Sequence, residues 1–99
     1  MVYGYSRCST NETKQDINRQ VRELKAAGAE EIFMEYDGDA KIKSQQQAMF
    51  AQAHAGDTIT VLEVSRLARS TQQLCEIIDL VREKHLRLVI VGSIILDCR

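Results

Sequence analysis

Residues 58–64, with the sequence TITVLEV, are nearly continuous in β-branched side chains, and they constrain the fold more than any other segment. Such side chains favour extended backbone. An apolar run without regular polar positions is typical of a strand that is buried within a parallel sheet. The run therefore predicts a sheet that is covered by helices.

Strand-like and helix-like segments alternate along the rest of the chain. Apolar segments at 2–5, 31–35 and 86–91 predict further strands, and helices are expected at about 12–28, 44–55 and 70–85. This alternation predicts βαβ units with right-handed crossovers. We expect one α/β domain over residues 1–99, in three layers, with a mostly parallel sheet of four to five strands and helices on both faces.

The composition excludes several classes of protein. Hydrophobic residues make up 44% of the chain and charged residues 27%, which is ordinary for a globular protein. No apolar run is long enough to span a membrane and no signal-peptide pattern opens the chain, so we expect a cytoplasmic protein with no membrane partner. Three cysteines without C-x-x-C spacing indicate neither a disulfide framework nor a metal site, and no cofactor is expected.

The first predicted strand ends in an unusual junction. Arg7, Ser9 and Thr10 lie where the apolar segment gives way to a polar one that leads into a helix. In open α/β sheets, ligands collect at the carboxyl ends of strands, and a helix N-terminus favours anions. Arg7 provides a fork that fits a phosphate, and Ser9 is a candidate nucleophile.

A second basic motif follows the third predicted strand. Arg66 and Arg69 are three residues apart, so they share a face if the segment is a helical turn. The first and third strands can be neighbours in a parallel sheet, which would bring both arginines near Arg7 and Ser9. Three guanidiniums around one hydroxyl suit phosphoryl transfer, and they can neutralise phosphate charge without a metal.

Simpler explanations exist for each of these residues. Ser9 and Glu12 fit a capping box, which alone would justify a serine at that point. Arg66 and Arg69 could simply be surface cations. His85 could simply be the partly buried end of a helix. Cys8 resembles the nucleophile of the low-molecular-weight tyrosine phosphatases, but their loop needs an arginine six positions later, where this chain has a lysine. Receiver-like and flavodoxin-like folds are disfavoured because no acidic pair follows the first strand.

Several short motifs together resemble one family. The segments 4–10 (GYSRCST), 20–24 (QVREL), 56–58 (GDT) and 65–70 (SRLARS) occur in the order and spacing of the serine recombinase catalytic domain, that of the resolvases and invertases. The resemblance extends over essentially the whole chain. It implies a resolvase-like fold and a site-specific recombinase that cleaves and rejoins DNA.

The resemblance also implies roles for individual residues. Ser9 would be the nucleophile that attacks a DNA phosphate, leaving a 5′-phosphoserine link and a free 3′-hydroxyl. Arg7, Arg66 and Arg69 would orient and stabilise that phosphate. DNA is therefore the expected partner, in reactions of DNA recombination, integration or transposition, and a dimer or tetramer is expected for the full-length protein.

Other positions match the family pattern less closely. Lys43 stands where the family usually has another active-site arginine, and lysine lacks the bidentate fork. Two residues are inserted after Ser9, so Gln15 and Gln20 are matched to the family's glutamines as supporting or phosphate-binding residues. Ser65 replaces a common aspartate, which removes one possible proton acceptor, whereas Asp57 is retained.

The chain ends where family members place a long dimerisation helix, and a DNA-binding domain is also missing from these 99 residues. The chain is therefore expected to be the catalytic core of a longer recombinase. The alternative is a catalytically impaired or truncated homologue that acts as a regulatory or DNA-associated module.

Overall fold

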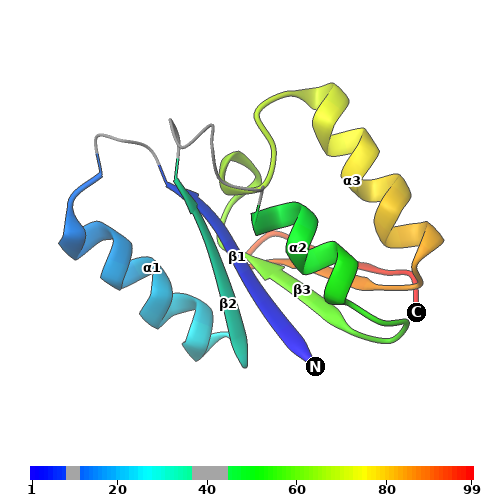
Figure 1. Ribbon diagram of the computed structural model, residues 1–99, viewed down its shortest axis with the longest axis horizontal. Coiled ribbons are helices and arrows are strands. Elements are labelled where there is room, and N and C mark those ends of the chain that lie inside the picture. Colours follow the sequence, from blue (N-terminus) through cyan, green and yellow to red (C-terminus); the bar gives the residue numbers. More distant parts are fainter. Residues whose placement is uncertain (9–11, 37–44) are drawn as a thin grey trace.

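The computed structural model describes residues 1–8, 12–36 and 45–99 of the chain, which form five strands, three α-helices and one turn of 3-10 helix (Figure 1). In chain order the elements are β1 (Val2–Cys8), α1 (Lys14–Ala26), β2 (Glu31–Tyr36), α2 (Gln45–Gln52), β3 (Thr58–Val61), η1 (Val64–Arg66), α3 (Thr71–Glu83), β4 (Arg87–Ile90) and β5 (Ile94–Asp97).

The five strands form one sheet in the order β2-β1-β3-β4-β5. All neighbours are parallel except β4 and β5, which are antiparallel. Only three residues join these last two strands, and Gly92 takes a positive φ of 74° in that turn. A connection this short cannot cross over to a parallel position, so β5 must fold back beside β4. The mostly parallel α/β fold expected from the sequence is confirmed.

Alternate residues of β1 face the two helical layers. Tyr3 and Tyr5 belong to the buried core that also contains side chains of α2 and α3, whereas Gly4 between them lies against Leu24 of α1. A Cβ atom at Gly4 would lie 3.0 Å from the Cβ atom of Ala29, so a larger residue would push that segment off the sheet. In Figure 1, α2 and α3 lie together, and α1 lies apart from them beside β2.

Two strand ends differ from the sequence-based expectation. The first strand does not stop at residue 5, because β1 remains paired with β2 as far as Cys8, opposite Tyr36. Arg7 therefore lies within a strand rather than in a loop. The third strand stops at Val61, before residue 64, and the chain then turns through η1. The predicted strand was too long because it included the apolar residue Val64, which lies in η1.

The helix boundaries also correct one assignment. Helix α1 begins at Lys14, and its capping box is formed by Thr13 and Asp16 rather than by Ser9 and Glu12. Ser70 caps α3, since its side chain accepts a hydrogen bond from the backbone of Gln73. His85 is not a partly buried helix end. It is exposed, follows the helix and has a positive φ of 56°.

Candidate active site

Two arginines meet where β1 ends beside η1, at the upper edge of the sheet in Figure 1. The NH2 group of Arg7 donates a hydrogen bond to the carbonyl oxygen of Ser65 over 2.9 Å. In return, the NH1 group of Arg66 donates to the carbonyl oxygen of Arg7 over 3.2 Å. The predicted convergence of Arg7 and Arg66 is therefore present, and it is fixed by backbone acceptors on both segments.

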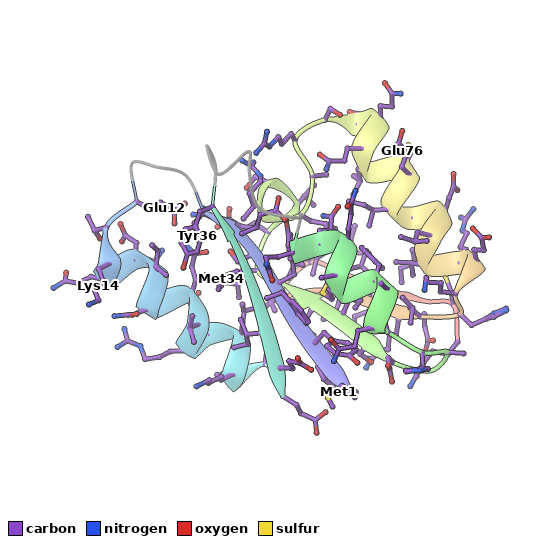
Figure 2. All side chains as sticks on the ribbon, in the orientation of Figure 1. Met1, Glu12, Lys14, Met34, Tyr36 and Glu76 are labelled. Atoms are coloured by element: carbon purple, nitrogen blue, oxygen red, sulfur yellow. The ribbon has the colours of Figure 1, made fainter. Side chains whose placement is uncertain are left out.

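Arg66 also forms an ion pair with Glu12, which lies near this edge, just ahead of α1 (Figure 2). The other carboxylate oxygen of Glu12 accepts a hydrogen bond from Nε2 of Gln20 over 2.5 Å. The side chain of Gln20 is buried and accepts a further hydrogen bond from the hydroxyl of Ser6. The hydrogen bond to Glu12 raises the pKa of Arg66 and so stabilises the charged form of its guanidinium further.

Arg69 follows η1 and lies close enough to Tyr5 to affect its ionisation. Burial is the main cause of the raised pKa of Tyr5, and the neighbouring carboxylate of Glu35 raises it further. The positive charges of Arg7 and Arg69 act in the opposite direction. Both arginines therefore lie within electrostatic range of the same buried hydroxyl.

Cys8 is the last residue of β1 and is fully buried. Burial raises the pKa of its thiol, and the negative charge of Glu12 raises it further. A buried thiol that keeps its proton is a poor nucleophile. This environment agrees with the sequence-based rejection of a cysteine-dependent phosphatase.

The other predicted residues fall into distinct places. Ser9 and Lys43 lie outside the described residues. Gln15 is exposed on the first turn of α1, whereas Gln20 is buried in the network described above. Asp57 is not near the arginines: it precedes β3 at the opposite edge, where its carboxylate binds the N-terminal amine and the backbone N–H of His54.

Ser65 reaches the site through its backbone. Its carbonyl oxygen binds Arg7, while its hydroxyl donates to the carboxylate of Glu63 over 3.1 Å. The replacement of an aspartate by serine at this position therefore leaves the carbonyl contact in place. A carboxylate is still close by, supplied two residues earlier in the chain.

Sequence reasoning missed Glu12, Glu35 and Gln46. Glu35 stands opposite Arg7 in the pairing of β1 with β2, and its carboxylate accepts from the backbone N–H of Gln46 over 3.1 Å. The side chain of Gln46 donates to the carbonyl oxygen of Leu67 over 2.9 Å, which ties α2 to the segment between Arg66 and Arg69. These contacts join segments that are 11 to 54 positions apart in the sequence, so no local motif signals them.

None of the described helices combines the length and apolar character needed to cross a membrane. Residues 2–97 match the family model described as the resolvase N-terminal domain. The chain is 34% identical over 87 residues to a resolvase of Clostridium perfringens strain 13, covering 85% of this chain and 45% of that protein.

Two further relatives are similar over the same region. The Tn1546 resolvase of Enterococcus faecium is 37% identical over 82 residues, which are 82% of this chain and 42% of that protein. The serine recombinase gin of Escherichia phage Mu is 32% identical over 85 residues, which are 85% of this chain and 43% of that protein. The chain thus spans less than half the length of these curated relatives.

Proposed function

Because this chain belongs to the resolvase N-terminal domain family, we propose that it is the catalytic domain of a serine-type site-specific DNA recombinase. Relatives that carry the names resolvase and serine recombinase support this activity. The proposed substrate is DNA in the cytoplasm, and the proposed working form is a homo-oligomer of the full-length protein. Integration, inversion, resolution and transposition are all compatible with the same cleavage chemistry.

In the proposed reaction, the hydroxyl oxygen of Ser9 attacks a phosphorus atom of the DNA backbone. A bond forms between that oxygen and phosphorus, and the bond from phosphorus to the 3′ oxygen breaks. The 3′ oxygen leaves and takes up a proton, which balances the proton lost from the serine. The products are a 5′-phosphoserine link and a free 3′-hydroxyl, and the reverse attack by a 3′-hydroxyl rejoins the strand.

Arg7, Arg66 and Arg69 have the proposed task of binding that phosphate. Their guanidiniums would neutralise the charge on its non-bridging oxygens and stabilise the additional charge of the transition state. Lys43 is proposed to add a fourth positive charge, and Gln15 is proposed to contact the phosphate or its neighbours.

The observation that carries the proposal is the reciprocal pairing of Arg7 with the η1 segment. Arg7 lies two positions before Ser9 in the chain, and its side chain bonds the residue that precedes Arg66. Arg66 bonds the backbone of Arg7 in return. Two charged forks are thereby fixed at the carboxyl edge of the sheet, where ligands of parallel α/β folds bind.

Incubation of the complete protein with supercoiled DNA that carries its recombination site tests the assignment. We expect a covalent adduct on the 5′ end of the cut strand. The adduct is detected as end-labelled DNA that stays with the protein until a protease is added. Ser9→Ala should abolish the adduct, and Ser93→Ala, at an exposed turn between β4 and β5, should leave it intact. An adduct of undiminished yield in Ser9→Ala would refute the role of Ser9.

A further inference from the structure

Four residues form a continuous hydrogen-bonded relay from the interior of the domain to the arginine site. The hydroxyl of Ser6 donates to Oε1 of Gln20, Nε2 of Gln20 donates to Oε2 of Glu12, and Oε1 of Glu12 pairs with NH1 of Arg66. Burial decreases along this path: Ser6 and Gln20 are fully buried, and the side chains of Glu12 and Arg66 are 12% and 23% exposed. The relay is anchored at its buried end.

The chemistry of the relay sets the orientation of each group. Because the carbonyl oxygen of Gln20 accepts from Ser6, its NH₂ group is turned toward Glu12. The two oxygens of Glu12 then bind different donors, which fixes the plane of the carboxylate. A charged hydrogen bond to a carboxylate that is itself fixed restricts the guanidinium of Arg66 more than a solvent-exposed partner would.

Glu12 directly precedes Thr13, the N-cap of α1. The start of α1 therefore brings a carboxylate to the arginine site. A carboxylate beside a phosphate-binding arginine lowers the local positive potential, which by itself opposes DNA binding. The benefit of the Glu12 carboxylate must therefore lie in the orientation that it gives to Arg66, not in attraction of the DNA.

We propose that Glu12 is a positioning residue for the recombination reaction, holding the guanidinium of Arg66 in a fixed orientation through the relay from Ser6 and Gln20. This inference rests on the proposed function, because it assigns Glu12 to the same site. Two consequences follow: loss of Glu12 frees the guanidinium of Arg66, and it slows strand cleavage without weakening the binding of DNA.

The first consequence can be measured without any DNA. Phenylglyoxal modifies deprotonated guanidiniums, and the rate at each arginine can be followed by mass spectrometry of peptides. In Glu12→Ala, Arg66 should react faster than in the wild type. The rate should rise about tenfold for each unit by which the removal of Glu12 lowers the pKa of Arg66. Glu12→Gln, which keeps the size of the side chain but not its charge, should give an intermediate rate.

The chain supplies matched references for this experiment. Glu76→Ala removes the same charge from an exposed position on α3, far from Glu12 in Figure 2, and should leave the rate at Arg66 unchanged. Arg22, exposed on α1, serves as the internal standard in every sample. A wild-type rate at Arg66 in both Glu12 variants overturns the inference, and Glu12→Gln decides the matter if Glu12→Ala does not fold.

The second consequence is measured with the complete protein under single-turnover conditions. Glu12→Ala should lower the rate of adduct formation on saturating DNA by roughly 10- to 100-fold, as expected when a reacting group loses its alignment. The DNA concentration for half-saturation should stay the same or fall, and Glu12→Gln should restore part of the rate.

A wild-type rate in Glu12→Ala, or a loss of DNA binding with an unchanged rate at saturation, contradicts a positioning role. If the wild-type protein forms no adduct at all, the proposed function fails instead. The reactivity of Arg66 toward phenylglyoxal then still decides whether Glu12 holds this arginine.

Discussion

Arg66 donates a hydrogen bond to the backbone carbonyl of Arg7 over 3.2 Å, although 59 positions separate the two residues in the sequence. The side chain of Arg7 returns the contact by binding the carbonyl oxygen of Ser65. Each guanidinium is therefore held by the segment that carries the other. A change at either arginine is expected to disturb both.

Arg66→Lys should lower the rate of adduct formation by roughly 10²-fold or more, because lysine keeps the charge but not the planar fork that orients a phosphate. Single-turnover cleavage at saturating DNA measures this effect. The control is Arg82→Lys, in the exposed last turn of α3, which should have the wild-type rate. An unimpaired Arg66→Lys protein would show that the charge alone is sufficient.

Lys43→Arg should increase the rate of cleavage, since a bidentate guanidinium binds a phosphate more specifically than an ammonium group does. The same single-turnover assay gives the rate, and filter binding gives the affinity for DNA. The absence of cleavage in both the wild type and Lys43→Arg would favour the alternative function, in which the domain is a regulatory or DNA-associated module that does not cleave.

Thr13→Ala should reduce the free energy of unfolding by about 1 kcal/mol, the usual effect of removing an N-cap side chain. Thr13 accepts the backbone hydrogen bond of Asp16 and completes the capping box of α1. Urea denaturation followed by circular dichroism measures the change. Ser9→Ala should lack this effect, because Thr13 already caps α1. An equal loss of stability in Ser9→Ala would instead support a capping role for Ser9.

Asp57→Asn should make the domain less sensitive to acid. Hydrogen bonds from His54 and the N-terminal amine lower the pKa of Asp57 in the folded state below its value of about 3.9 in unfolded chains. A lowered pKa stabilises the fold above that unfolded value, and the contribution is lost as the pH falls through the folded value. Urea titrations at pH 7 and pH 3 should therefore differ less in Asp57→Asn than in the wild type.

The isolated 99 residues should bind DNA weakly and with strong dependence on salt, because the net charge is -1 and three arginines and Lys43 supply the expected phosphate contacts. With about 0.9 counterions released per contact, the logarithm of the dissociation constant should rise with the logarithm of salt concentration with a slope of roughly 3.6. Tight binding of this fragment to one specific site would contradict the prediction.

The sequence alone determined the fold class, because hydrophobic pattern and β-branched content are local properties. The apolar run that begins at Thr58 required a buried strand, and the regular alternation of strands and helices required a mostly parallel sheet. The cap of α3 at Ser70 can also be predicted from the sequence, since a capping side chain bonds a backbone group only three residues away.

Only the tertiary structure decided where β1 ends and which groups surround the arginines. Strand β1 continues through the polar residues Ser6 and Arg7 because β2 supplies hydrogen-bond partners for their backbone. The local sequence pattern does not specify this pairing. The carboxylate of Glu12 meets Arg66 across 54 positions of sequence. Such contacts arise when the sheet brings distant segments to one edge, so the serine and arginine motifs could be found in the sequence but the hydrogen bonds around Arg66 could not.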